Sequence, residues 1–198
     1  MIQRITTGDP AGAMLDAALA RAFDALRAGV ADHRSTFRTP VLATIGMGGA
    51  PALRTVVLRG FDPAARCLHI HTDRRSPKFA QLAADGRAAL HGYDPQSRLQ
   101  LCLHGHAVLH VGDAAADAAW TASRETSRMT YAGTHPPGTP LRAPPVAPTD
   151  AAAGRAQFGL VSFTFDALDW LMLDPAGNRR ACFAWAADGT LTATWIAP

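Results

Sequence analysis

One short stretch of the chain places positive charge and a hydroxyl where a predicted strand leads into a predicted helix. It is His71-Thr72-Asp73-Arg74-Arg75-Ser76-Pro77-Lys78. Ser76 followed by Pro77 is typical of the cap and first position of a helix. Backbone N–H groups at a helix N-terminus attract anions, and Arg75, Ser76 and Lys78 would add charge and a hydroxyl donor. The stretch predicts a phosphate site, with Ser76 as a plain helix cap as the competing interpretation.

Lys78 is unusual because of the composition around it. It is the only lysine among 19 basic residues, and Glu125 is the only glutamate among 16 acidic residues. Such a bias would remove any lysine that arginine can replace, so the remaining one suggests a position where a compact ammonium group matters. Chance survival is the alternative interpretation.

A second charged stretch is Arg54-Thr55-Val56-Val57-Leu58-Arg59. In a single strand, residues 54, 56 and 58 would lie on one face and residues 55, 57 and 59 on the other. Arginines that flank a buried strand are usually its solvated ends. Together with the stretch from residue 71 to residue 78, however, they favour a ligand that carries negative charge.

Gln100 lies on a long alternating segment and shares a face with Cys102, His104 and His106. A polar layer of this kind could bind the edge of a heterocycle through the Gln100 amide. The same histidines permit a different prediction, because His104 and His106, with His110 or with His69 and His71, could bind a metal in a β-barrel. We predict no metal site, because His110 lies at the strand end and no glutamate follows.

The elements that position these residues are mostly strands. Asp9-Pro10 predicts the start of a helix whose apolar residues recur at helical spacing until Gly29. Strand patterns cover residues 41–45, 53–59, 67–72, 88–93, 99–109, 158–165, 168–173, 180–185 and 191–196, and helices are expected after Ser76 and over residues 114–124. Roughly eight strands and about three helices without βαβ alternation predict a mostly antiparallel β-barrel with flanking helices.

Length and composition restrict the remaining possibilities. The 198 residues, of which 48% are apolar, suit one domain over 1–198 with an internal proline-rich loop at 133–155. We expect a cytoplasmic protein, because there is no signal peptide pattern and no apolar run near the roughly 18 residues of a membrane span. The three widely spaced cysteines suggest no disulfide framework. The net charge of +3 comes from scattered arginines, which does not indicate nucleic-acid binding.

The ordered motifs resemble one known family. R-x-x-x-L-[KR] at 54–59, a strand ending in Thr72, S-x-K at 76–78, Y-D-P at 93–95 and R-x-Q-x-x-x-x-G at 98–105 resemble the pyridoxamine 5′-phosphate oxidase-related FMN-binding proteins. The resemblance runs from about Thr39 to Leu109 and resumes from Phe158 to the C-terminus. It implies an antiparallel FMN-binding split β-barrel, and a homodimer with the flavin at the subunit interface.

The resemblance also implies roles for individual residues. Arg54, Thr55, Val56, Val57, Leu58 and Arg59 would line the FMN, together with His71 and Thr72, while Lys78 and Ser76 would bind its phosphate and Gln100 would lie near the ring. Pro77 stands where the family often has an arginine, so Arg74 or Arg75 would compensate. Arg179 and Arg180 are the candidate substrate residues, but they lack the Arg-x-His spacing of authentic oxidases.

The function that the resemblance implies is flavin-mediated oxidation of a small molecule, with oxygen as the electron acceptor. The missing Arg-x-His pattern keeps a second function open, that of an FMN-binding reductase or carrier without pyridoxamine phosphate oxidase activity. A histidine-bound metal in a β-barrel is the third alternative. No side chain in the sequence stands out as a catalytic base.

Overall fold

Nine antiparallel strands form one continuous sheet in the structure, a computed structural model that describes residues 10–198. The strands are β1 Val41–Ile45, β2 Pro51–Thr55, β3 Leu58–Asp62, β4 Cys67–Asp73, β5 Arg87–Asp94, β6 Leu99–His110, β7 Phe158–Met172, β8 Arg179–Trp185 and β9 Leu191–Ile196. Their order is β2-β1-β5-β6-β7-β4-β3, and β8 and β9 continue from β7. The predicted mostly antiparallel β fold with flanking helices is confirmed.

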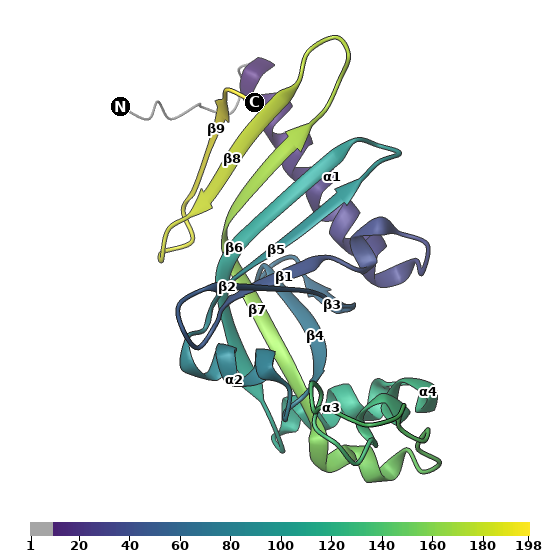
Figure 1. The fold of residues 1–198 in the computed structure, drawn as a ribbon. Helices are drawn as coiled ribbons and strands as arrows, with labels where there is room; N and C mark the ends of the chain where they lie inside the picture. The colour runs from purple at the N-terminus through teal and green to yellow at the C-terminus, as the bar shows by residue number, and fades with distance from the viewer. Residues whose placement is uncertain (1–9) are drawn as a thin grey trace.

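Strand β7 connects the sheet because it pairs with three other strands. Along one edge it follows β6, from Met172 opposite Leu99 to Leu160 opposite His110. Along the other edge its first half pairs with β4 and its second half with β8. The two halves of β7 therefore belong to two ends of the molecule, and Figure 1 shows β8 and β9 at the end opposite α3 (Ala114–Ala122).

Helix α1 (Pro10–Ala31) packs on the sheet and contributes to the main core. Its buried residues Leu15, Ala18, Ala22 and Leu26 recur at helical spacing. Gly29 was expected to end the helix but lies inside it, because its missing side chain admits a close neighbour. A Cβ at Gly29 would lie 2.7 Å from the carbonyl oxygen of Phe37. Asp9, the predicted cap, lies outside the described residues.

The helices α2 (Pro77–Ala84), α3 and α4 (Glu125–Arg128) lie at the end of the molecule away from β8 and β9 (Figure 1). Helix α2 packs against β1 and β6. Helix α3 is capped by Asp113, whose side chain accepts from the backbone N–H of Ala116, and α4 leads into a 3₁₀ turn at Met129–Tyr131. Residues 133–151 contain no helix or strand, whereas residues 152–155 of the predicted proline-rich loop belong to a 3₁₀ helix at Ala152–Gln157. No helix within residues 10–198 is both long and apolar enough to cross a membrane.

Three of the predicted strands are wrong in their extent. The run 53–59 is not one strand, because β2 ends at Thr55 and pairs with β1, whereas β3 begins at Leu58 and pairs with β4. Between them the Val56 N–H donates to the carbonyl of Pro40 at 3.0 Å. Conversely, 158–165 and 168–173 form the single strand β7, in which Asp166 is an extra residue at a bulge opposite His104 and Gly105. Local periodicity does not report which neighbour each half-strand pairs with.

Candidate functional site

The N-terminus of α2 begins as predicted at Ser76, but its hydroxyl does not cap the helix. The hydroxyls of Ser76 and Thr72 lie 3.3 Å apart, and both residues are only 2% exposed. Ser76 has the extended backbone typical of a cap, with Pro77 at the first helical position. The competing interpretation of Ser76 as a plain side-chain cap therefore does not hold, and its hydroxyl lies in a buried polar pair at the helix start.

Arg54 reaches from β2 toward α2. Its guanidinium donates to the hydroxyl of Thr44 at 2.6 Å and to Oε1 of Gln81 at 2.7 Å. Thr44 also donates to Oε1 of Gln81 at 2.7 Å. Burial lowers the pKa of Arg54. Its partners are all neutral, so the charge of Arg54 is held in place but not compensated by a carboxylate.

Lys78 lies near Arg54 and shares its lack of a counterion. Burial and then the neighbouring Arg54 lower the pKa of Lys78, and the more distant Asp73 opposes them. The ammonium makes no hydrogen bond or ion pair with any residue between 10 and 198. A half-buried ammonium beside a guanidinium is unfavourable unless an anion joins them.

Arg59 and His71 form the other side of this region. The Arg59 guanidinium also has no hydrogen-bond or ion-pair partner in the described part of the chain. Burial, followed by Arg59 and His69, lowers the pKa of His71 to about 4, so His71 is neutral at pH 7. Its ring packs edge-on against Phe158, with centroids 4.9 Å apart, and Nδ1 lies 3.4 Å from the hydroxyl of Ser123. We call Arg54, Arg59 and Lys78 the cationic cluster, in which Arg54 influences Lys78 and Arg59 influences His71 and Tyr131.

The residues between Arg54 and Arg59 cross from β2 to β3. Val56 and Leu58 are buried in the main core, Thr55 is exposed, and Val57 is half-buried. The two arginines therefore belong to different strands, and Val57 is the apolar residue between them with its side chain partly accessible.

Arg75 is engaged within the chain. Its guanidinium forms an ion pair with Asp73, with Nη2 2.7 Å from Oδ2, and donates to the carbonyls of Gly133 at 2.9 Å and Thr134 at 3.3 Å. These contacts satisfy the guanidinium through a carboxylate and the proline-rich loop. Arg74, the other residue expected to compensate for Pro77, is exposed.

Gln100, Arg179 and Arg180 lie at the opposite end of β6 and β7. Gln100 faces Leu171 and Arg180 faces the same Leu171, whereas His71 faces Leu160. Leu160 and Leu171 are eleven residues apart on β7, which corresponds to roughly 35 Å along the strand. Within one chain, Gln100 does not reach His71.

Both candidate substrate arginines have acidic neighbours. Arg180 Nη2 lies 2.6 Å from Asp169 Oδ2, and Arg179 Nη2 lies 3.8 Å from Asp174 Oδ2. The hydrogen bonds that Arg180 donates to Asp169 raise the pKa of Arg180. We call Gln100, Asp169 and Arg180 the paired cluster, because its arginine is already neutralised.

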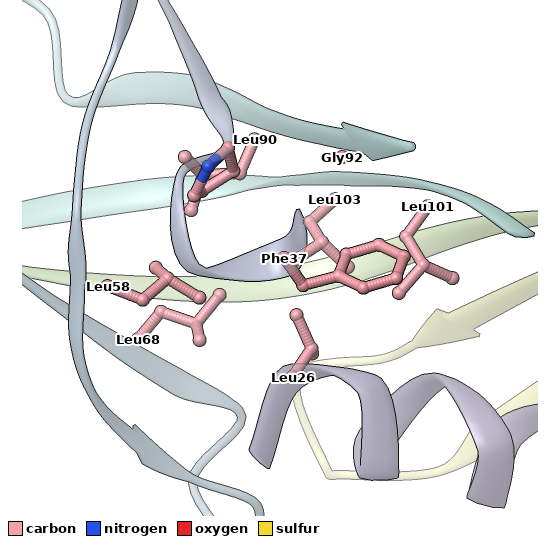
Figure 2. Close-up of a pocket in the computed structure, with 9 residues that line it drawn as sticks. Leu26, Phe37, Leu58, Leu68, Leu90, Gly92, Leu101 and Leu103 are labelled. Carbon is pink, nitrogen blue, oxygen red and sulfur yellow. The ribbon is translucent and has the colours of Figure 1, made fainter. Parts of the chain in front are cut away.

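Neither of two cavities within residues 10–198 is a complete cofactor site. The cavity in Figure 2 holds only about 10 Å³, room for about one water. Its walls are apolar: Leu26, Phe37, Pro40, Leu58, Leu68, Leu90, Gly92, Leu101 and Leu103. An open groove of about 250 Å³ is bordered by Thr44, which also contacts Arg54, and by Arg87 and His104. Ligand pockets usually measure about 300 to 1,000 Å³.

The histidines of the metal alternative do not converge. Within residues 10–198, no three His, Cys, Asp or Glu side chains are arranged to hold a metal ion. His104 contacts Cys102, with 3.4 Å between Nε2 and Sγ, and His110 contacts Asp113 at 2.9 Å. His104 and His106 therefore lack a third ligand in the described structure.

Three residues of the site were not foreseen. Thr44 and Gln81 hold Arg54, and Tyr131 lies near Arg59, which counteracts the rise that burial causes in the pKa of Tyr131. Gln81 follows Lys78 by three residues, so helical spacing alone could have placed both on one face. No local signal links Thr44 or Tyr131 to this region, because both come from distant parts of the chain.

Comparison with protein families gives a match that covers most of these motifs. A family profile described as "Pyridoxamine 5′-phosphate oxidase, FMN-binding domain" matches residues 18–111. Over this region, a little under half of its length, the chain is similar to the pyridoxamine 5′-phosphate oxidase-related FMN-binding family. The matched region contains the cationic cluster, α2 and Gln100.

Curated relatives carry the same family name. The chain is 29% identical over 167 residues to pyridoxine/pyridoxamine 5′-phosphate oxidase 2 of Arabidopsis thaliana, covering 78% of this chain and 82% of that protein. It is 36% identical over 111 residues to pyridoxine/pyridoxamine 5′-phosphate oxidase of Anaeromyxobacter dehalogenans, covering 56% and 54% of the two chains. The bacterial alignment thus spans about half of that enzyme.

Solved structures share the fold over almost the whole chain. A pyridoxamine 5′-phosphate oxidase-related, FMN binding protein from Nostoc punctiforme has a TM-score of 0.76 at 25% identity, covering 90% of this chain and 96% of the other. PhzG from Burkholderia lata has a TM-score of 0.70 at 18% identity, covering 100% and 99%. The second likeness is one of fold alone. The fold is the FMN-binding split barrel that the sequence predicts.

FMN is the cofactor of this family, and the residues present fit its phosphate. Lys78 and Arg59 are half-buried cations without partners in residues 10–198, and the buried hydroxyls of Thr72 and Ser76 lie at the start of α2. Phosphate binds well where cations, hydroxyls and a helix N-terminus converge. The donor set therefore suits the anionic end of FMN.

Proposed function

We propose that this protein is an FMN-dependent oxidoreductase of the pyridoxamine 5′-phosphate oxidase type that acts on a small molecule. The cationic cluster carries this proposal. Its charges are half-buried, and none of its three members has a carboxylate partner in the described chain. Burying a charge without a counterion is costly, so the retention of several together supports an anionic ligand.

Each residue of the site has a proposed task. Lys78 and Arg54 neutralise the phosphate of FMN, and Thr72 and Ser76 donate hydroxyl hydrogen bonds to it. The neutral imidazole of His71 and the side chain of Val57 contact the flavin. Bound FMN supplies two-electron redox chemistry. The chain orients the cofactor and sets the charge around it, and we assign no side chain the role of a base.

We further propose that the active unit is a homodimer with the flavin at the subunit interface. Gln100 lies roughly 35 Å along the strands from His71 of its own chain, so both can serve one flavin only if two chains contribute. A twofold axis would create two identical sites, each with the cationic cluster of one chain and the paired cluster of the other.

Mixing two defective subunits tests the dimer. Lys78→Ala and Gln100→Ala would each impair both sites of their own homodimers. In a refolded equimolar mixture, about one quarter of the sites should regain wild-type FMN affinity, because half the dimers are mixed and each has one intact site. A mixture that binds no better than the average of the two variants contradicts a shared site.

A second candidate function has a specific observation in its favour. Arg180, which would hold the substrate, is paired with Asp169 at 2.6 Å. An arginine that is already neutralised is a weaker anion ligand, which favours an FMN-binding reductase or carrier without pyridoxamine phosphate oxidase activity.

One set of measurements separates these functions. The purified protein is titrated with FMN by absorption and fluorescence, and then supplied with pyridoxamine 5′-phosphate and oxygen while peroxide is measured. Saturable FMN binding with peroxide release supports the oxidase, and binding without turnover supports the reductase or carrier. Absence of saturable FMN binding contradicts both.

A further inference from the structure

The chain contains two turns in which an arginine follows an aspartate by two residues. In the first, the backbone N–H of Arg75 donates to Asp73 Oδ1 at 2.8 Å and its Nη2 donates to Oδ2 at 2.7 Å. In the second, the corresponding distances from Arg87 to Asp85 are 3.0 and 2.6 Å. The two ion pairs are almost the same in local geometry.

The two turns differ in what else the arginine contacts. Arg75 also donates to the carbonyls of Gly133 and Thr134, whereas Arg87 has no such partner in the described chain. The side chain of Arg75 is 20% exposed, compared with 68% for Arg87. Arg75 therefore joins the turn before α2 to a segment almost sixty residues further along the chain.

That segment, Tyr131 to Gly138, lies beside the candidate FMN site at both of its ends. At one end the Tyr131 ring packs on Phe158 with centroids 5.2 Å apart, and Phe158 packs on His71 at 4.9 Å. At the other end, a Cβ placed on Gly138 would lie 3.8 Å from Cγ of Pro77, the first residue of α2. The Arg75 contacts lie between these ends.

Tyr131 presents a polar group on this segment. The residue is 7% exposed, yet its hydroxyl makes no hydrogen bond with residues 10–198. Arg59 and Asp73 both influence the pKa of Tyr131, which burial raises, so the phenol lies in the charged region and is protonated at neutral pH. A protonated phenol without a partner is available to donate a hydrogen bond to a ligand.

We propose that the segment Tyr131–Gly138 is a wall of the flavin site and that Arg75 is the residue that positions it. This assigns Arg75 a task other than direct binding of the phosphate. The wall shields the bound flavin from solvent and turns the Tyr131 hydroxyl toward the ligand. The inference rests on the proposed function, since the wall needs a flavin to cover.

Arg75→Ala and Arg87→Ala form a matched pair of variants for the test. Both remove an arginine from an Asp-x-Arg turn, but only the first removes the contacts with residues 133 and 134. FMN affinity is measured first. Iodide quenching of bound-flavin fluorescence then reports solvent access, and tryptic cleavage after the exposed Arg142 reports the mobility of the adjoining loop.

We expect Arg75→Ala to increase iodide quenching and cleavage at Arg142 by about threefold or more, with FMN affinity changed by less than about threefold. Arg87→Ala should match the wild type in all three measurements. Arg75→Lys keeps the charge but cannot make the forked contacts, so we expect the same increases in quenching and cleavage. It provides the test if Arg75→Ala folds poorly.

The outcomes separate the wall from the proposed function. Tight FMN binding in all variants with equal quenching and cleavage overturns the wall and leaves the proposed function standing. A loss of FMN affinity of tenfold or more in both Arg75 variants, without increased quenching, assigns Arg75 to the phosphate and also overturns the wall. A wild-type protein without FMN binding contradicts the proposed function itself.

Discussion

The paired cluster and the cationic cluster differ in how the charge of their basic residues is neutralised. In the paired cluster, Arg180 lies 2.6 Å from the carboxylate of Asp169. In the cationic cluster, Arg54 is held by the neutral groups of Thr44 and Gln81, and Lys78 and Arg59 have no partner at all in residues 10–198. The charge of the paired cluster is compensated within the chain, and the charge of the cationic cluster is not compensated within residues 10–198.

This difference distinguishes an arginine that forms an ion pair within the fold from cations that gain a counterion only when an anionic ligand binds. A carboxylate beside an arginine makes a local ion pair whose contribution to stability is small at the surface. Half-buried cations that approach one another cost free energy in the empty protein and recover it when an anion binds. The following predictions test this difference, and the largest expected change in free energy comes first.

Strands β6 and β7, which run between the two ends of the molecule, are in close contact at Gly105. A Cβ on Gly105 would lie 2.0 Å from the carbonyl oxygen of Thr164 and 2.6 Å from Cα of Phe165, both of which are backbone atoms. Gly105→Ala should therefore reduce the free energy of unfolding by about 3 kcal/mol or more, as measured by urea denaturation. Gly48→Ala is the control, because a Cβ there meets nothing within 4 Å. Equal free energies of unfolding for the two variants would contradict a close contact of β6 and β7 at Gly105.

Removing the ammonium of Lys78 should affect the ligand more than the fold. Lys78→Ala should weaken FMN binding by about 1 to 3 kcal/mol, the scale of one charge-assisted hydrogen bond. Its stability without FMN should be unchanged or slightly higher, because a like charge next to Arg54 is removed. Fluorescence titration and urea denaturation measure the two quantities. A large loss of stability with unchanged FMN affinity would make Lys78 a structural residue.

His71 gives the cationic cluster a pH dependence. Its pKa is lowered to about 4 from 6.5, so the unfolded chain binds its proton more tightly than the folded chain. The stability from His71 is therefore complete above pH 6.5 and is lost as the pH falls toward 4. We expect the wild type to lose about 1 to 2 kcal/mol more than His71→Asn over this range, a value reduced for partial exposure. Parallel losses in the two proteins would contradict the buried neutral imidazole.

The smallest effect is expected at the paired cluster. Arg180→Ala breaks an ion pair that is partly exposed, so the free energy of unfolding should change by less than about 1 kcal/mol and FMN affinity by less than about twofold. The same two titrations used for Lys78→Ala provide the comparison. If Arg180→Ala weakens FMN binding as much as Lys78→Ala does, the paired cluster and the cationic cluster do not differ in the way that we describe.

The sequence predicts the parts of the site that depend on neighbouring residues. The strand predicted to end at Thr72, the cap position of Ser76 and the start of α2 at Pro77 follow from local patterns, and the structure contains them, with the strand one residue longer, to Asp73. The family resemblance adds FMN, because its motifs keep their order and spacing from Arg54 to Gly105.

The parts that sequence could not supply depend on long-range pairing. Arg54 and Arg59 lie in a run that reads as one strand, yet their halves pair with β1 and β4 respectively. The contact of Arg75 with Gly133 joins residues that no local period relates. The separation of Gln100 from His71 likewise follows only from the register of β7 with β6 and β4.

The central claim is that the cationic cluster binds the phosphate of FMN, and riboflavin, which lacks that phosphate, tests it most directly. The ratio of the riboflavin and FMN dissociation constants is measured for the wild type and for Lys78→Ala. We predict that the substitution weakens FMN binding about 10-fold to 100-fold and leaves riboflavin binding within about twofold, so that the preference for FMN collapses. Equal weakening of both ligands, or an unchanged ratio, would contradict a phosphate contact at Lys78.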